Sequence, residues 1–194
     1  MIQSGKFDSF MNFKNNIEKI RNFLFERLIE FFGVLLLISG FLILLSLISY
    51  NPNDPNFIYP SSQIIENLLG IRGSIVADFL FQSIGLVALF IPITLIFLSI
   101  SIIFEKKLVL IIKSLFFIIC YSIVGSIFFT QFYNEAFFLV INGNGGFVGN
   151  YFYNNTFFKI LNSNSQISYY LELSLFTVLF IISINFKLSW LVNL

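Results

Sequence analysis

The stretch from Phe31 to Tyr50 contains twenty residues and no Asp, Glu, Lys or Arg. As an α-helix, a stretch of this length reaches about 30 Å, which is the thickness of the hydrocarbon core of a lipid bilayer. The whole chain has 194 residues, of which only 11% are charged, whereas an average soluble domain has about 25%. The sequence therefore predicts an all-α protein that spans a membrane.

Three further apolar segments are long enough to cross a bilayer. The four predicted spans are residues 31–50, 84–104, 108–129 and 169–186. Together they predict a four-span membrane domain over residues 31–190. Pro92 lies inside the second span and predicts a kink, which membrane helices tolerate because neighbouring groups satisfy the freed carbonyl. Glu105, Lys106 and Lys107 predict a tight polar turn between the second and third spans.

The two longer connections contain turn-forming residues. Pro52 and Pro55 end the first span, because proline cannot continue a helix. A short helix is expected over residues 62–69, closed by Gly70, and a second one over residues 147–161. We expect these short helices at the membrane interface or in the periplasm.

Lys and Arg residues are distributed unevenly between the two sides of the predicted bundle. Nine of the eleven fall in the N-terminal segment, around the connection between the second and third spans, and at the C-terminal end. The other two, Arg72 and Lys159, lie in the longer connections. Since cytoplasmic loops carry the excess of Lys and Arg, both termini are expected to be cytoplasmic.

Residues 1–30 combine polar and apolar side chains in a helical pattern. The apolar positions that share one helix face are Phe10, Phe13, Ile17, Ile20, Leu24 and Leu28. Lys14 and Arg21 flank this face. Two interpretations of this cytoplasmic segment remain open. It is either an amphipathic helix in the membrane interface, with its basic residues near anionic head groups, or an ordinary solvated helix that leads into the first span.

The chain lacks the residues of most catalytic and metal-binding sites. It has no His and one Cys, Cys120, which excludes most zinc sites, iron–sulfur clusters, Ser-His-Asp triads and Cys-His nucleophiles. The pattern G-x-x-x-x-G-K-[ST], which binds nucleotide phosphates, does not occur. We therefore expect no catalytic residue, cofactor or metal in this chain. Cys120 lies in an apolar stretch and is expected to be a small core residue.

A series of short motifs follows the first span. The chain reads SYNPNDP over residues 49–55, NLLG over residues 67–70, AD at 77–78 and GNGGFVG over residues 143–149. In this order they resemble the N-terminal four-span membrane domain of the FtsK/SpoIIIE family of bacterial DNA translocases, over residues 28–190. That family has S-Y-x-x-x-D-P, N-x-x-G-x-x-G, A-D and G-x-G-G-x-x-G elements at similar places. The residues that carry the resemblance are Ser49, Tyr50, Asp54, Pro55, Asn67, Gly70, Gly73, Asp78, Gly85, Gly143, Gly145, Gly146 and Gly149.

The resemblance implies a membrane anchor and septal targeting module, which acts in cell division and chromosome segregation through contacts with the divisome. The implied location is the bacterial inner membrane at the division septum, and the implied partners are membrane lipid and divisome membrane proteins. Whether the chain forms a homo-oligomer is left open, and a hexamer is implied only where a motor is attached. No direct binding of nucleic acid by this segment is expected. The sequence contains no motor domain, so the ATPase of that family would belong to a longer or a separate product.

Individual features also have simpler structural interpretations. Residues 49–55 are interpreted mainly as the exit of a helix, with a partner contact as the alternative. Residues 143–149 are interpreted as a turned loop and not as a phosphate site. Asp78 and Glu172 are interpreted as charges near the interface. If the second and fourth helices are neighbours, a pairing of Asp78 with Arg72 is a further hypothesis.

Two other classes of function are compatible with four spans. A small oligomeric channel or transporter subunit is the main alternative to an anchor, although the spans lack a ring of charged residues. An intramembrane enzyme would need convergent polar groups deep in the spans, and the sequence indicates none. Ser122, Gly125 and Ser126 instead share one face of the third span, where small residues favour close packing within the bundle, with a contact between copies as the alternative.

Overall fold

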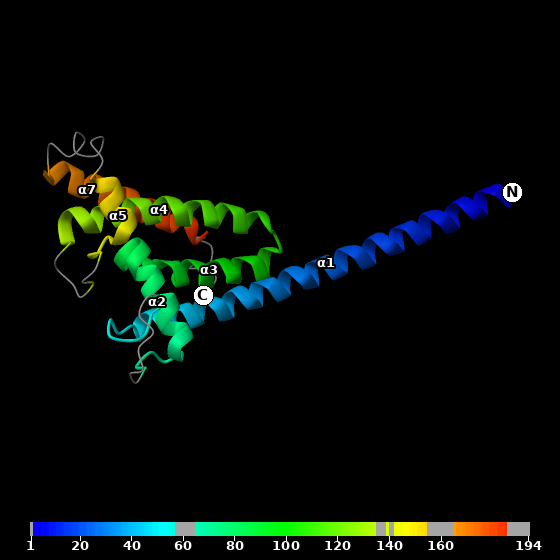
Figure 1. Ribbon diagram of the computed structural model, residues 1–194. Helices are drawn as coiled ribbons and strands as arrows, with labels where there is room; N and C mark the ends of the chain where they lie inside the picture. The colour runs from blue at the N-terminus through cyan, green and yellow to red at the C-terminus, as the bar shows by residue number, and fades with distance from the viewer. Residues whose placement is uncertain (1, 57–64, 135–138, 140–141, 155–164, 186–194) are drawn as a thin grey trace, which may run out of the picture.

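The computed structural model describes residues 2–56, 65–134, 139, 142–154 and 165–185, which form helices and turns without a strand. The helices are α1 (Ile2–Ile48), α2 (Gly70–Ile84), the 3₁₀ helix η1 (Gly85–Leu89), α3 (Phe90–Glu105), α4 (Val109–Tyr133), α5 (Gly146–Tyr153) and α7 (Ser165–Ser183) (Figure 1). Four segments are long and apolar enough to cross a membrane, namely Asn16–Ile48, Gly70–Glu105, Val109–Tyr133 and Gln166–Ser183. The prediction of an all-α protein with four spans is therefore confirmed, whereas the cytoplasmic side of the termini stays a prediction.

Two pairs of long helices form the bundle. α1 packs most extensively against α3, and α4 packs most extensively against α7 (Figure 1). α2 packs on the last part of α1 and on α5, and it leads through η1 into α3. We call the end that carries α2, α5 and the C-terminal end of α1 the loop-bearing end. The turn between α3 and α4 lies at the opposite end.

α1 is one continuous helix of 47 residues. It contains both the predicted N-terminal segment and the predicted first span, so the backbone has no break at residue 30. The second half of α1 approaches α3 closely, because a Cβ at Gly33 would lie 2.6 Å from Cγ1 of Ile103 and one at Gly40 would lie 3.0 Å from Cγ1 of Ile96. The first half continues as a rod beyond the bundle (Figure 1).

The second spanning segment is interrupted at Gly85 and not at Pro92. Gly85 has a φ of +65°, and the residues that follow it form η1. Only glycine adopts such a φ without strain. Pro92 is the third residue of α3, in the first turn, where a missing N–H costs little. The predicted kink at Pro92 is therefore wrong, and the glycine accounts for the break.

Gly70 begins α2 and does not end a short helix. The predicted helix at 62–69 starts among residues outside the described ones, and the described residues 65–69 form a turn. In this turn the side-chain Oδ1 of Asn67 accepts the N–H of Leu69 (3.1 Å), and the carbonyl of Asn67 accepts the N–H of Gly70 (2.8 Å). Such local hydrogen bonds compete with a helix, so the predicted helix is wrong over 65–69.

The other predicted helices differ from the structure mainly at their ends. α5 covers the first half of the predicted helix over residues 147–161, and residues 155–164 lie outside the described ones. α7 begins four residues before the predicted start of the fourth span, at Ser165. The predicted end of that span, at residue 186, lies outside the described residues.

Buried hydroxyl and amide groups join the spanning helices. The hydroxyl of Thr94 lies 3.1 Å from that of Tyr121 and 3.3 Å from that of Ser183. Ser114 donates a hydrogen bond to the carbonyl of Ser183 (2.8 Å), and Asn185 donates one to the hydroxyl of Ser114 (2.8 Å). These bonds connect α3, α4 and the end of α7, where lipid offers polar groups no alternative partner.

The small residues of the third span face the inside of the bundle. A Cβ at Gly125 would lie 2.8 Å from the ring of Phe176 and from Cγ2 of Val87. The hydroxyl of Ser126 donates a hydrogen bond to the carbonyl of Ile84 (2.9 Å). The predicted packing of small residues within the bundle is therefore confirmed at these two positions of α4.

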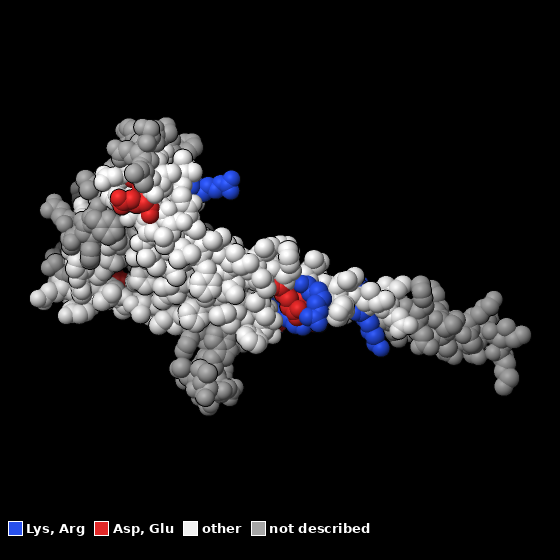
Figure 2. Space-filling view, turned by 90° about the horizontal axis from the view of Figure 1, so that it is seen from below, with Lys and Arg blue, Asp and Glu red and all other residues white. Residues whose placement is uncertain are grey.

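An ion-pair cluster marks the end opposite to the loop-bearing end. Nζ of Lys106 lies 2.7 Å from Oε2 of Glu26 and 3.1 Å from Oε1 of Glu30, and Arg27 pairs with Glu30. Figure 2 shows charged side chains gathered where the rod of α1 leaves the bundle, while most of the bundle surface in this view is uncharged. Because charges avoid the hydrocarbon core, we infer that one membrane boundary lies near residues 26–30.

Candidate functional site

The predicted signature residues meet at the loop-bearing end, in two contacts between segments that are distant in the sequence. The first contact, here called the turn network, contains Ser46, Ser49, Asp54, Asn67 and Gly73. The second, here called the glycine contact, contains Gly85, Asn144, Gly145, Gly146 and Gly149. Because each contact joins several elements, the loops are held against the ends of the spanning helices.

Asp54 holds together the two described parts of the first long connection. Its side chain is only 6% exposed. One carboxylate oxygen accepts the backbone N–H of Glu66 and the other accepts the backbone N–H of Asn67, both at 2.9 Å. The side chain of Asn51 also donates to the carboxylate of Glu66 (2.6 Å). A buried carboxylate is thus stabilised by two backbone donors, which have no other described partner in this turn.

Asn67 caps the C-terminal end of α1 from a distant turn. Its side-chain Nδ2 donates to the carbonyl of Ser46 (2.9 Å) and to that of Ser49 (3.3 Å). The last carbonyls of a helix have no partner within the helix, so they need such donors when they are buried. The hydroxyl of Ser49 accepts the N–H of Leu68 (3.1 Å), which fixes the same turn a second time.

Gly73 lets α2 approach this turn. A Cβ at Gly73 would overlap Oδ1 of Asn67. The hydroxyl of Ser46 donates to the carbonyl of Gly73 (2.5 Å), and the hydroxyl of Ser74 donates to the carbonyl of Pro55 (2.6 Å). The motif positions Asn67 and Gly73 therefore depend on each other, because a larger residue at one displaces the other.

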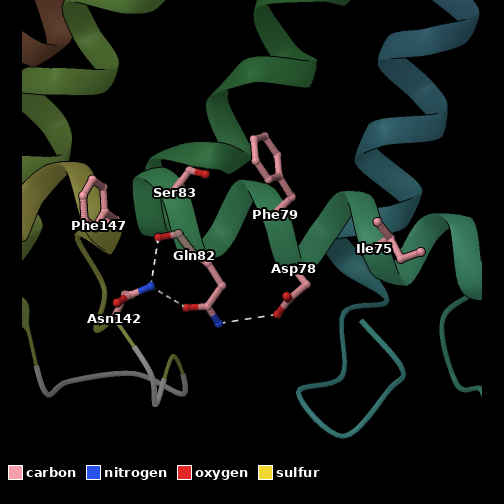
Figure 3. Close-up of a pocket in the computed structure, with 7 residues that line it drawn as sticks. All are labelled: Ile75, Asp78, Phe79, Gln82, Ser83, Asn142 and Phe147. Carbon is pink, nitrogen blue, oxygen red and sulfur yellow. Dashed lines mark hydrogen bonds between the residues drawn. The ribbon is translucent and has the colours of Figure 1, made fainter. Parts of the chain in front are cut away.

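Asp78 connects the turn network to the second long connection. Its Oδ1 accepts hydrogen bonds from the hydroxyl of Tyr50 (3.1 Å) and from Nε2 of Gln82 (3.4 Å). Asn142 in turn donates to Oε1 of Gln82 (2.9 Å) (Figure 3). Among the described residues no ion pair joins Asp78 to Arg72, so that predicted pairing is wrong. Burial, together with the negative charge of Asp78, raises the pKa of Tyr50 to about 12.

A cavity of about 550 Å³ lies beside this chain of hydrogen bonds. The residues around it are Ile75, Asp78, Phe79, Gln82, Ser83, Asn142 and Phe147 (Figure 3). Its lining is mainly apolar, and the side chains of Asp78, Gln82 and Asn142 in it are joined by the hydrogen bonds described above. Within the described part of the chain, no three His, Cys, Asp or Glu side chains gather in a way that could hold a metal ion.

The glycine contact seals the break between α2 and α3. The carbonyl of Asn144 accepts the N–H of Leu86 (2.9 Å). A Cβ at Gly85 would overlap that same carbonyl, and a Cβ at Gly146 would lie 2.5 Å from the backbone nitrogen of Gly85. Two backbones therefore touch at a point where neither can carry a side chain.

The remaining glycines of the run pack on α4. A Cβ at Gly145 or Gly149 would overlap the carbonyl of Ser126 and the hydroxyl of Thr130. The side chain of Asn144, which is fully buried, donates to the carbonyl of Tyr133 near the end of α4. The run is thus a tight turn over residues 143–145 that continues as the first residues of α5, so the predicted loop is correct for its first part and wrong for Gly146–Gly149. Gly143, with φ +67°, could not carry a Cβ without overlapping the side chain of Asn134.

Sequence reasoning missed Ser46 and three amide residues of this site, namely Gln82, Asn142 and Asn144. Each of the four has at least one hydrogen-bond partner on a different element. Asn144 lies inside the GNGG motif, and the motif was interpreted from its glycines alone. The carbonyl of Asn144 nevertheless accepts the N–H of Leu86, and its side chain donates to the carbonyl of Tyr133. Gly70 is the opposite case, because no atom lies within 4 Å of a Cβ placed there and only its φ of +64° favours glycine.

We expect the Tyr50→Phe protein to lose about 1 kcal/mol of stability at neutral pH, because one hydrogen bond to a charged acceptor disappears. The raised pKa of Tyr50 means that the folded chain keeps this proton up to about pH 12, whereas an unfolded tyrosine releases it near pH 10. The contribution of Tyr50 is therefore complete below about pH 10 and is lost as the pH rises toward 12.

The measurement is SDS-induced unfolding of the purified chain in mixed micelles, followed by circular dichroism over this pH range. The difference in unfolding free energy between the natural chain and the Tyr50→Phe variant should shrink above about pH 10. A difference that stays constant up to pH 12 would contradict the contact with Asp78.

Comparison with known proteins gives one family and several relatives. A family model described as the 4TM region of DNA translocase FtsK/SpoIIIE matches residues 26–193. A protein named DNA translocase FtsK from Rickettsia typhi is 44% identical to this chain over 59 residues, and one from Rickettsia prowazekii is 41% identical over 61 residues. No solved structure matches.

The matches to the two relatives cover 30% and 31% of this chain but only 8% of each relative. This chain thus corresponds to a small part of those proteins. The family model concerns a membrane region and not a motor domain, and it extends over most of the chain, including most of the first span, the other three spans and both contacts described above. The chain belongs to the family of four-span membrane regions of FtsK/SpoIIIE DNA translocases.

Proposed function

We propose that this chain is the membrane anchor and septal targeting module of an FtsK-like DNA translocase in the bacterial inner membrane. One observation above all supports the proposal: the signature residues hold both long connections against one end of a four-span bundle. The polar groups of Asp54 and Asn67 are satisfied by the backbone, so they stabilise a surface and are not available for a reaction. A rigid surface of this kind is suited to binding.

The proposal assigns ATP hydrolysis and DNA movement to a motor outside this sequence. The name DNA translocase FtsK describes the whole of each relative, and the matched region is only 8% of that length. The matched family model describes a membrane region. This chain would contribute attachment to the bilayer and contacts with other division proteins, without a cofactor and without direct contact with DNA.

The loop-bearing end also offers side chains for such contacts. Phe147 and Tyr151 stack with ring centroids 6.2 Å apart on α5, and they are 62% and 59% exposed. Phe79 on α2 is 68% exposed. Exposed aromatic side chains at the end of a spanning bundle suit the membrane interface or the interface with another membrane protein.

A fluorescent fusion of this chain in dividing bacterial cells tests the proposal. We expect a band of fluorescence at midcell. The Gly85→Ala variant should give a uniform membrane signal instead, because it opens the glycine contact, and the Gly70→Ala variant should keep the band. A uniform membrane signal from the natural sequence would overturn the targeting role. A band that survives Gly85→Ala would assign targeting to a part of the chain other than the loop-bearing end.

A further inference from the structure

A groove of about 290 Å³ lies between α1 and α2 at the loop-bearing end. Three residues of α1 and three of α2 are among those that line it, namely Leu42, Ile43, Ser46, Arg72, Gly73 and Val76. Leu42 is 46% exposed and Val76 is 39% exposed, so the groove is open to its surroundings. Arg72 is its single charged residue, and most of the other lining side chains are apolar.

The guanidinium of Arg72 has no partner in the described part of the chain. Arg72 is exposed, and none of the ion pairs among the described residues includes it. The two nearest described carboxylates along the chain, those of Glu66 and Asp78, accept hydrogen bonds from neutral side chains instead. The N–H donors of this guanidinium are therefore free to bind a ligand that carries negative charge.

The first turn of α2 lies at the height of the second membrane boundary. The ion-pair cluster marks one boundary near residues 26–30, and a hydrocarbon core of about 30 Å corresponds to about 20 residues of helix. The second boundary therefore lies near Ile48, where α1 ends. Because the hydroxyl of Ser46 donates to the carbonyl of Gly73 (2.5 Å), the neighbouring Arg72 lies near the level of the lipid phosphates. Leu42 lies one helical turn deeper than Ser46, in the hydrocarbon.

α2 also has the form of a helix that lies in the membrane interface. Figures 1 and 3 show it running across the direction of α1. Its exposed residues are Ile71, Arg72, Val76 and Phe79. One cation among exposed apolar side chains suits the boundary between lipid head groups and acyl chains. η1 and α3 run from Gly85 to Glu105, which is long enough to cross the hydrocarbon core without α2.

We propose that this groove binds one anionic phospholipid of the membrane, with the lipid phosphate on the guanidinium of Arg72 and an acyl chain along α1 past Ile43 and Leu42. A guanidinium presents parallel N–H donors that match two oxygens of a phosphate. The apolar wall of α1 continues from the groove toward the centre of the bilayer. The groove therefore suits a phosphate that is attached to an acyl chain better than a water-soluble anion.

Charge complementarity favours an anionic lipid over a zwitterionic one. A zwitterionic head group carries a cation that already balances its phosphate, whereas the phosphate of an anionic lipid gains the charge of Arg72 in full. The backbone beside Arg72 is also held in place, because Ser46 donates to the carbonyl of Gly73 and Ser74 donates to that of Pro55 (2.6 Å). Binding at a site that is already formed costs little reorganisation.

Native mass spectrometry of the purified full chain, in detergent micelles with equal amounts of phosphatidylglycerol and phosphatidylcholine, tests this inference. We expect the first bound lipid to be phosphatidylglycerol roughly five times as often as phosphatidylcholine, which is the preference that one cation at a membrane surface supplies. Arg72→Gln should remove this preference without changing unfolding in the absence of lipid, and Arg72→Lys should retain most of it. Lys107→Gln, which removes a cation at the opposite end, should leave it unchanged.

A second pair of variants separates the groove from the charge alone. Val76→Phe narrows the groove but keeps Arg72, and it should remove the preference, whereas Val178→Phe at an exposed position of α7 should not. An excess of inorganic phosphate should leave the lipid bound. Equal binding of the two lipids by the natural chain, a preference that survives Arg72→Gln or Val76→Phe, or displacement by inorganic phosphate would each overturn the site. The result is independent of septal targeting, since the purified sample contains no other division protein.

Discussion

The Gly85→Ala variant is expected to unfold more easily than the natural chain by about 3 kcal/mol or more. Two costs add up at this position. A residue with a Cβ at φ +65° and ψ −147°, a region that essentially only glycine adopts, costs about 1–3 kcal/mol, and the new methyl group would overlap the carbonyl of Asn144, which is backbone and cannot swing aside. Overpacking of this kind costs about 1–3 kcal/mol more. SDS-induced unfolding in mixed micelles, followed by circular dichroism, measures the difference.

Gly70→Ala is the matched control for this prediction. Gly70 has nearly the same φ, +64° against +65°, but no atom lies within 4 Å of a Cβ built there. The Gly70→Ala substitution should cost only the free energy of placing a residue with a Cβ at this positive φ, about 1–2 kcal/mol. If the two variants were equally stable, the break between α2 and α3 would not depend on contact with the second long connection.

The Asp54→Ala variant is expected to lose about 3 kcal/mol of stability and to expose the first long connection to protease. The substitution removes two hydrogen bonds from a charged acceptor, each worth about 1.5–3 kcal/mol. It also leaves the backbone N–H groups of Glu66 and Asn67 without their acceptor in a turn that caps α1. Unfolding in mixed micelles gives the free energy, and limited proteolysis in vesicles reports on the connection.

Asn53→Ala serves as the control beside Asp54. Asn53 is exposed, and its described hydrogen bond is made by the backbone N–H, which the substitution keeps. Its effect should stay within about 0.5 kcal/mol. The Asp54→Asn variant keeps one carboxylate-like oxygen and should lie between the two. Wild-type stability and protease resistance in Asp54→Ala would show that the turn is held by other contacts.

The four spans could be predicted from the sequence because the bilayer imposes a length and a composition that few soluble helices share. The ends of the spanning helices were predicted less accurately, because polar residues such as Ser165 and Gln166 extend a helix beyond the apolar stretch that marks the span. The sequence left two alternatives open for the N-terminal segment, and the continuous helix α1 agrees with the one in which that segment leads directly into the first span. The choice could not be made from the sequence, because no Pro or Gly between Leu24 and Phe31 marks a break and nothing else there excludes one.

The interruption at Gly85 was beyond sequence reasoning for a physical reason. Pro92 carries a local signal, while the effect of Gly85 depends on Asn144, which is 59 positions away. The same holds for Asp78, where formal charge suggested Arg72 and the actual donors are the neutral side chains of Tyr50 and Gln82. The signature residues were predicted from the resemblance of their motifs to those of the family, and their division into two contacts became visible only in three dimensions.

The two contacts close at different moments of protein synthesis. The turn network uses only residues between Ser46 and Gly73, so it can form once the first membrane segment, its connection and the start of the second segment have been made. The acceptor for the N–H of Leu86, in contrast, is the carbonyl of Asn144, which follows the third segment in the chain. We therefore expect the start of α2 to be fixed before the break at Gly85, which takes its final form only after the third segment has been made.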